Sequence, residues 1–208
     1  MTKPALLLIG AGGHAQACID VIEQCGQFQI VGLVGTYEEV HVTRLGYPIL
    51  GTDEDLPQLL NRSRHACIAV GQLDTSERRI TLYSRAIEAG FELPTIISPT
   101  AYVSRHATVG AGSIVMHGAV VNAGARIGLN CIINTHSLIE HGALVGDHCH
   151  ISTGAILNGN VTVGNDSFVG SGSILKEGVS VGARCMIGMG VSVRHDQPDD
   201  AKFTGQAK

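Results

Sequence analysis

An aliphatic residue recurs at every sixth position through the second half of this chain. Steps of six from Val103 to Val193 meet sixteen consecutive Val, Ile or Leu residues. The fourth residue after each of them is small (Ala, Ser, Cys or Val) at every step from 107 to 191. A period of six fits neither the 3.6-residue turn of an α-helix nor the alternation of a simple β-strand. It predicts a β-solenoid in which three six-residue faces close one coil of eighteen residues.

Fifteen such hexads between residues 103 and 192 make five coils without an inserted loop. We expect the aliphatic side chains to point into the prism and to form a continuous core as the coils stack. Gly or Asn often follows the aliphatic residue, as at Gly110 and Asn122, and we expect these residues to form the tight corners. This half also holds 17 of the 27 glycines and carries no net charge, with 7 basic and 7 acidic residues.

The first 95 residues instead alternate predicted strands with predicted helices. Such alternation favours a small Rossmann-like parallel sheet with right-handed crossovers. We therefore divide the chain into an α/β domain over residues 1–95 and an all-β solenoid domain with a C-terminal tail over residues 96–208. The predicted strands are 5–9, 29–34 and 65–70, and the predicted helices are 16–25, 53–60 and 76–89.

The composition excludes several classes of partner. The chain has 14 basic and 18 acidic residues, a net charge of -4, so it lacks the basic surface of a nucleic-acid-binding protein or of one that binds anionic membranes. No apolar run approaches the roughly 20 residues of a membrane span, and the apolar opening is too short for a leader. Cys131, Cys149 and Cys185 fall in the small-residue column, and no Cys-x-x-Cys occurs. We expect reduced thiols, no structural zinc and a cytoplasmic protein.

A glycine-rich turn follows the first predicted strand. Ligands of parallel sheets bind beyond the carboxyl ends of the strands, and helix N-termini there bind phosphates. An NAD-binding fingerprint would place an acidic residue about 20 residues on, but Gly35 and Thr36 stand there. The turn is better explained as a site for the phosphates of a nucleotide sugar. Gly71, which follows the third predicted strand, is expected at the same site. The predicted substrate-binding residues are Gly10, Gly12, Gly13, His14 and Gly71.

Six of the ten histidines lie within the repeats between residues 103 and 193, and none falls in the inward column. His136 and His141 are five residues apart, a spacing similar to the zinc pair of solenoid carbonic anhydrases. Those enzymes need a third histidine two coils earlier, where this chain has Thr100, and they lack an N-terminal α/β domain. We therefore predict no metal. The solenoid histidines are His106, His117, His136, His141, His148 and His150.

Two motifs together resemble one family. The Gly-x-Gly-Gly-His turn precedes a solenoid that reads Asn-Thr-His-Ser-Leu-Ile-Glu-His over 134–141 and Val-Gly-Asp-His-Cys-His over 145–150. This combination resembles the bacterial sugar O- and N-acetyltransferases: the sialic acid O-acetyltransferases, and the N-acetyltransferases of 4-amino-4,6-dideoxy sugar nucleotides of the bacillosamine and perosamine type. These are left-handed parallel β-helix proteins of the hexapeptide-repeat superfamily.

The resemblance implies roles for individual residues. His141 becomes the proposed catalytic base, His150 contacts acetyl-CoA, and the glycine turn binds the sugar nucleotide. The superfamily forms homotrimers with CoA between two solenoids, which makes Gly159, Ser171 and Gly188 cofactor contacts by motif position.

The chain departs from the family pattern in three places, one of which is the acidic pair that often follows the second strand, where this chain has Gly35 and Thr36. The family commonly has an acidic residue directly after the base, where this chain has Gly142, so Glu140 or Asp147 becomes the candidate to orient His141. The usual Gly-x-Pro-Ala-Lys tail reads Gly-Gln-Ala-Lys over 205–208.

The chemistry expected from these residues is direct acetyl transfer in a ternary complex. A neutral imidazole, with a usual pKa of about 6.5, accepts a proton at neutral pH and contributes roughly 100- to 10,000-fold as a general base. A backbone N–H of the coil wall would stabilise the thioester oxyanion. We predict an acetyl-CoA-dependent N-acetyltransferase of a nucleotide-linked 4-amino-4,6-dideoxy sugar for surface glycan synthesis. Two alternatives stay open: O-acetylation of sialic acid or a related sugar, and a non-catalytic scaffold that binds a nucleotide sugar and tolerates loss of His141.

Overall fold

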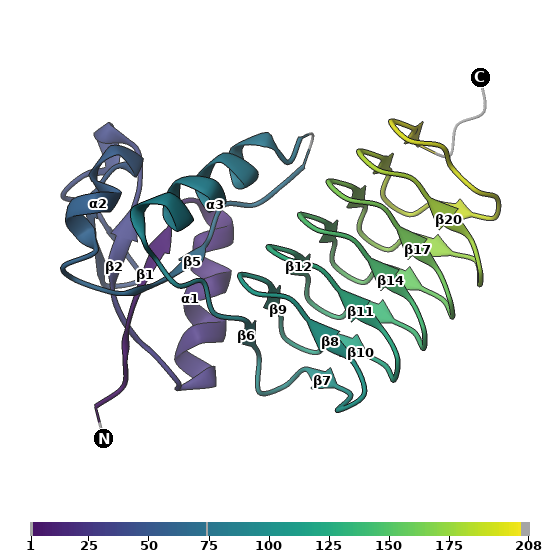
Figure 1. Ribbon diagram of the computed structural model, residues 1–208, viewed down its shortest axis with the longest axis horizontal. Coiled ribbons are helices and arrows are strands. Elements are labelled where there is room, and N and C mark those ends of the chain that lie inside the picture. The colour runs from purple at the N-terminus through teal and green to yellow at the C-terminus, as the bar shows by residue number, and fades with distance from the viewer. Residues whose placement is uncertain (1, 74, 205–208) are drawn as a thin grey trace. The chain divides into compact units, whose positions relative to one another are not determined.

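A computed structural model describes residues 2–73 and 75–204, which form an α/β unit and a β-helix (Figure 1). The first compact unit extends to Gly71 and resumes over Glu77–Ile96, whereas the second contains Gln72–Ser76 and the chain from Ile97 onward. The predicted tail motif at 205–208 lies outside the described residues.

The α/β unit is built on a five-stranded sheet with the order β3-β4-β2-β1-β5. The central strands pair in parallel, as predicted, but β3 and β4 form an antiparallel hairpin that the sequence analysis missed. Leu45 and Gly46 close it with φ angles of 47° and 86°, as a two-residue hairpin turn requires. The sheet is therefore mixed. Its strands are β1 (Ala5–Ile9), β2 (Gln29–Val34), β3 (Thr43–Arg44), β4 (Tyr47–Gly51) and β5 (His65–Ile68).

Two long helices accompany this sheet. The first, α1 (Gly13–Cys25), buries Cys18, Ile19 and Ile22, and it ends where Gly26 adopts φ 66° and donates its N–H to Ile22 O. The second is α3 (Glu77–Ala89). The helix predicted over 53–60 is shorter than expected: a 3-10 turn, η2 (Asp53–Asp55), precedes the four-residue α2 (Leu56–Leu59). A second 3-10 turn, η1 (Tyr37–Glu39), follows β2.

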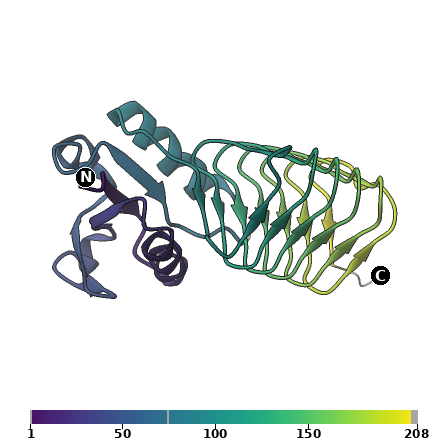
Figure 2. The ribbon, with the colours of Figure 1, turned by 90° about the horizontal axis from the view of Figure 1, so that it is seen from below.

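The second unit confirms the predicted left-handed β-helix. From Tyr102–Val103 to Ile174–Leu175, each two-residue strand pairs in parallel with the strand eighteen residues later, as Ile133 does with Ile151, whereas Met186–Ile187 pairs with Lys202–Phe203 sixteen residues later. Three flat sheets result, and Figure 2 shows their strands aligned along the stack of coils. Face 1 comprises β7 (Tyr102–Val103), β10 (Val120–Val121), β13 (Leu138–Ile139), β16 (Ile156–Leu157), β19 (Ile174–Leu175) and β22 (Ser192–Val193). Face 2 comprises β8 (Thr108–Val109), β11 (Arg126–Ile127), β14 (Leu144–Val145), β17 (Thr162–Val163) and β20 (Ser180–Val181). Face 3 comprises β6 (Ile96–Ile97), β9 (Ile114–Val115), β12 (Ile132–Ile133), β15 (His150–Ile151), β18 (Phe168–Val169), β21 (Met186–Ile187) and β23 (Lys202–Phe203).

The aliphatic column forms the core, as the sequence predicted. Its members from Val115 to Val193 are all buried, whereas Val103 and Val109 in the first coil are partly buried. Cys131, Cys149 and Cys185 are buried free thiols in the same core. The three corners between faces are named here edge 1–2, edge 2–3 and edge 3–1, after the faces that they join.

The prediction that the residue after each aliphatic forms the tight corner was wrong. The left-handed φ angles fall two residues later, at 112, 118 and every sixth position to 190. The glycines that follow the aliphatic residues serve close packing between coils instead. A Cβ on Gly110 would lie 2.5 Å from Gly128 O, and one on Gly170 would lie 2.5 Å from the carbonyl carbon of Gly188. These positions need glycine because the next coil lies directly against them.

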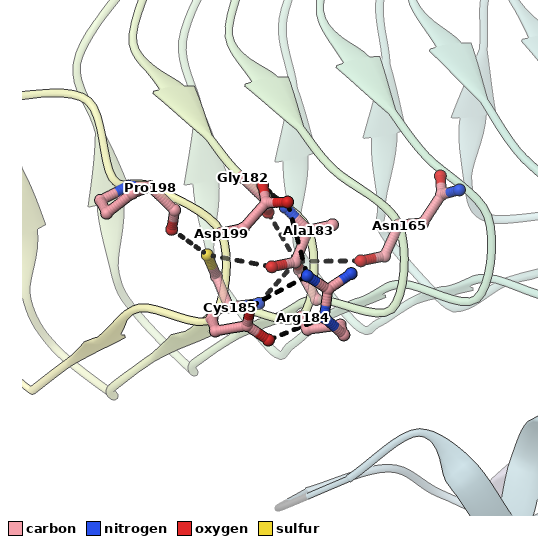
Figure 3. A network of polar contacts seen from close by, with 9 residues as sticks. Asn165, Gly182, Ala183, Arg184, Cys185, Pro198 and Asp199 are labelled. Carbon is pink, nitrogen blue, oxygen red and sulfur yellow. Dashed lines mark hydrogen bonds and ion pairs between the residues drawn. The ribbon is translucent and has the colours of Figure 1, made fainter.

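Residues after the last full coil continue the wall of the prism. Cys185 donates its thiol to Pro198 O at 3.0 Å, and Asp199 accepts the N–H of Ala183 at 2.9 Å (Figure 3). Arg184 binds the two carboxylate oxygens of Asp200 at 2.7 and 2.9 Å. The adjacent guanidinium lowers the pKa of Asp200. This exposed network fastens the segment before β23 to edge 2–3.

Candidate active site

His141 lies on edge 1–2, in the turn between β13 and β14. It is exposed, and no hydrogen bond to its ring comes from any residue within 2–73 or 75–204. Glu140 accepts the backbone N–H of His141 at 3.1 Å, so its carboxylate holds the turn rather than the ring. Asp147 lies on edge 2–3, where it accepts the N–H of Leu129 at 2.7 Å. Neither carboxylate therefore contacts the imidazole in this structure.

Packing explains the glycine that follows His141. Gly142 adopts φ 67° to close the turn, and a Cβ there would collide with the side-chain oxygen of Asn160 in the next coil. An acidic side chain at this position would require Asn160 to move.

Gly159 lies one coil beyond His141 and supports its ring. A Cβ on Gly159 would lie 2.5 Å from Cε1 and 2.7 Å from Nε2 of His141. The imidazole can therefore lie against the next coil only because position 159 has no side chain. An exposed imidazole held in this way can exchange a proton with a ligand.

His150 has a different environment on face 3. It is 5% exposed, and its ring meets the ring of Phe168 edge-on with centroids 5.2 Å apart. Nδ1 lies 2.7 Å from the carbonyl oxygen of Gln72, which can only accept, so Nδ1 carries the proton. Asn134 accepts the N–H of Thr135 through Oδ1, so its amide nitrogen donates to His150 Nε2 at 3.1 Å. These partners hold the His150 ring in one orientation.

The other three predicted cofactor contacts lie on two edges of the prism. Ser171 and Gly188 lie on edge 3–1, where Ser171 Oγ is 2.9 Å from Ser152 Oγ. Gly188 packs against the last strand, and a Cβ there would lie 3.1 Å from Thr204 Cα. Gly159 lies with His141 on edge 1–2. Within one chain, face 1 separates the two groups.

The glycine turn lies where β1 ends and α1 begins. Gly10 has φ 124°, and a Cβ there would lie 2.7 Å from Val70 Cγ2, so this position requires glycine. Gly12 is the N-cap of α1 and has no side-chain cap, and nothing lies within 4 Å of a Cβ on Gly12 or Gly13. His14 lies beside Gly71, whose Cβ would be 3.5 Å from His14 Cβ. The open amide groups at this helix N-terminus can receive an anionic group.

Two charged residues beside this turn were not predicted from the sequence. Arg44 donates from Nε to Ala11 O at 2.8 Å and from Nη2 to Glu39 Oε1 at 2.8 Å. Glu39 also accepts the N–H of Thr36 at 3.0 Å, and this bond and Arg44 lower the pKa of the Glu39 carboxyl. An acidic side chain, Glu39, thus lies close to the end of the second strand, where it pairs with Arg44. The Thr-x-x-Glu spacing over 36–39 is a capping box, which could have identified it.

Other features of the described residues limit the chemistry. They contain no group of three His, Cys, Asp or Glu side chains that could hold a metal ion. His136 lies on edge 3–1, away from His141 on edge 1–2, so the spacing of five does not bring these two rings to the same edge. Across residues 2–73 and 75–204, no helix has the length and apolarity needed to cross a membrane.

Comparisons with known proteins identify both halves of the chain. Residues 5–82 match the PglD N-terminal domain, and residues 123–158 and 160–194 match the hexapeptide repeat of succinyl-transferase. No match was found among curated proteins.

Solved structures match over nearly the whole chain. A histidine-to-asparagine variant of perosamine N-acetyltransferase from Caulobacter crescentus, in complex with CoA and GDP-perosamine, is 33% identical; 94% of this chain and 90% of that chain align, with a TM-score of 0.86. The acetyltransferase domain of PglB from Neisseria gonorrhoeae, in complex with acetyl coenzyme A, is 32% identical over 95% of this chain and 94% of that chain, with a TM-score of 0.87. WeeI from Acinetobacter baumannii, at 20% identity over 92% of this chain and 94% of that chain, shares the fold with a TM-score of 0.71. The chain therefore belongs to the hexapeptide-repeat sugar acetyltransferases, in which a PglD N-terminal domain precedes the β-helix.

Proposed function

We propose that the protein transfers the acetyl group of acetyl-CoA to the amino group of a nucleotide-linked 4-amino-4,6-dideoxy sugar, with His141 as the general base. One observation carries the assignment of the base: the exposed His141 ring lies against Gly159 without a hydrogen-bond partner among the described residues. The relatives solved with GDP-perosamine and with acetyl coenzyme A support the choice of acceptor and donor.

The reaction needs one proton acceptor and one oxyanion donor. The amino nitrogen attacks the acetyl carbonyl carbon, His141 takes the proton that the nitrogen loses, and the new C–N bond replaces the C–S bond. CoA leaves as the thiolate and receives a proton, which regenerates the neutral imidazole. A backbone N–H on the coil wall stabilises the tetrahedral oxyanion. No covalent enzyme intermediate is required.

The separation of His141 from Ser171 and Gly188 supports a site shared by two copies of the chain. The outward side chains of face 1 are mostly apolar, with Tyr102 58% and Ile174 43% exposed. Those of face 2 are mostly polar. If face 1 packs against other copies around a threefold axis, edge 1–2 of one copy meets edge 3–1 of the next. We therefore propose a homotrimer with CoA between adjacent β-helices. The outward residues of face 1 are Tyr102, Val120, Leu138, Ile156, Ile174 and Ser192, and those of face 2 are Thr108, Arg126, Leu144, Thr162 and Ser180.

The acceptor would bind through its phosphates to the glycine turn, where the N-terminus of α1 is open. His14 and Gly71 line the same turn, and Arg44 and Glu39 adjoin it. Acetyl-CoA and sugar nucleotides are cytoplasmic metabolites, so the proposed reaction belongs in the cytoplasm.

The test is thiol release from acetyl-CoA with UDP- and GDP-linked 4-amino-4,6-dideoxy sugars and with sialic acid. The proposal predicts turnover of an amino sugar and a loss of at least about 100-fold in His141→Ala, the lower range for a general base. His106→Ala, an exposed histidine on the same edge, is the matched control and should keep full activity. Turnover of sialic acid alone would assign O-acetylation instead, and activity undiminished in His141→Ala would refute the assigned base. Binding of nucleotide sugar without thiol release would favour the scaffold.

A further inference from the structure

β5 is the last strand of its sheet, so one side of its backbone needs hydrogen-bond partners from outside the sheet. β1 pairs with the other side. On the outer side, Glu92 donates its N–H to Arg64 O and accepts the N–H of Ala66, both at 2.9 Å. Pro94 stands two residues later and has no N–H, so it cannot extend this ladder. The carbonyl groups at the carboxyl end of β5 therefore need another donor.

Arg79 is that donor. It lies in the first turn of α3 and is 1% exposed, although its guanidinium carries a permanent charge. Its Nη1 donates to Ile68 O at 2.7 Å and to Val70 O at 2.8 Å. Hydrogen bonds from a charged donor are stronger than those between neutral groups, and a single nitrogen that bonds both carbonyls fixes their relative position. Arg79 thus holds the backbone from the last residue of β5 through the two residues that follow it.

The backbone that Arg79 holds forms one wall of the glycine turn. A Cβ on Gly10 would lie 2.7 Å from Val70 Cγ2 and 2.9 Å from Val70 N, so Val70 packs directly against the turn. The next residue is Gly71, where a Cβ would lie 3.5 Å from His14 Cβ at the beginning of α1. The close contact at Gly10 leaves no free space between the turn and the end of β5. A shift of that strand end would therefore displace the residues that line the turn.

We propose that Arg79 is a positioning residue for the acceptor: it fixes Val70 and Gly71 so that the glycine turn keeps the shape that binds the nucleotide sugar. This inference rests on the proposed function, because it takes the turn as the acceptor site. Since its side chain is buried, Arg79 acts through these two residues and not by contact with the acceptor. The predicted donor contacts lie in the β-helix unit, so we expect the binding of acetyl-CoA not to depend on Arg79.

The test compares the wild-type protein with Arg79→Met, which keeps an apolar stem in the core and removes both hydrogen bonds. We expect KM for the sugar nucleotide to rise about tenfold, with kcat and KM for acetyl-CoA changed less than about twofold. Arg79→Lys keeps a charged donor and should recover most of the lost affinity. Leu82→Ala is the matched control, because Leu82 is a buried residue of the same helix whose side chain cannot hydrogen-bond to β5. It should lower the free energy of unfolding but leave KM for the sugar nucleotide unchanged.

Equilibrium dialysis with UDP, GDP and CoA separates failure of this inference from failure of the proposed function. Binding of the preferred nucleotide that is about tenfold weaker in Arg79→Met, with CoA bound as in wild type, supports the role of Arg79 even without turnover. Unchanged nucleotide binding in Arg79→Met overturns the inference, and so does an equal loss in Leu82→Ala, since lower stability alone would then explain the effect. Arg79→Gln, which is too short to reach both carbonyls, carries the test if Arg79→Met does not fold. If the wild-type protein binds neither nucleotide, the proposed acceptor site itself fails, and the inference with it.

Discussion

The contact between His141 and Gly159 makes Gly159→Ala the sharpest single perturbation of this site. The added methyl would lie 2.5 Å from His141 Cε1, whereas ordinary carbon contacts begin near 3.5 Å. The ring must therefore withdraw by about 1 Å, and a misplacement of that size can cost about 100-fold in rate. Because the imidazole is exposed and can turn toward solvent, the melting temperature should stay within about 2 °C of wild type.

The assay is kcat for thiol release, with the melting temperature of each variant measured alongside. A double-mutant cycle with His141→Ala isolates the contact, because Gly159→Ala should cost no further activity once the ring has been removed. A wild-type kcat in Gly159→Ala would show that this contact does not position the ring. An equal loss in both backgrounds would show the same, since the methyl would then act through something other than the imidazole.

Three further predictions concern stability. Leu157→Ala removes a fully buried side chain from the β-helix core and should lower the free energy of unfolding by about 2–5 kcal/mol in urea titrations. Arg79 is 1% exposed and donates to the buried Ile68 O at 2.7 Å and to the partly buried Val70 O at 2.8 Å. Arg79→Leu leaves both carbonyls without this donor and should cost about 2–3 kcal/mol; an unchanged unfolding midpoint would contradict this. Arg184 lowers the folded-state pKa of Asp200. The ion pair therefore stabilises the fold above the usual Asp pKa of about 3.9, and this stabilisation is lost as pH falls through the lowered pKa. Melting curves of wild type and Asp200→Asn should accordingly differ at pH 7 and converge in acid.

The β-helix was predictable because its core pattern is periodic. Each aliphatic residue from Val115 to Val193 is buried, so the period of six reports the coil directly. The roles of the individual glycines could not be predicted from the sequence. Gly110 and Gly142 look alike in sequence, but the first permits close packing of coils and the second closes a turn at positive φ. Only the placement of the next coil distinguishes them.

Long-range contacts explain what sequence analysis missed at the candidate site. The hairpin that contains Arg44 brings the Arg44 guanidinium to the backbone oxygen of Ala11, 33 residues earlier. No local sequence pattern predicts that bond. Gln72 was likewise missed, because its backbone oxygen contacts His150 across 78 residues. The histidine motif identified His141 and His150 as candidates, yet it could not show that one ring is exposed and the other is held between two hydrogen bonds.

We propose that the active site is assembled from edge 1–2 of one copy and edge 3–1 of the next. Subunit complementation tests it most directly: His141→Ala damages the first edge, and Ser171→Trp obstructs the second. Each variant alone should be inactive. After subunit exchange in an equal mixture, about a quarter of the sites should combine two intact edges, so about a quarter of wild-type activity should return. If exchange is demonstrated and no activity returns, the shared site is contradicted.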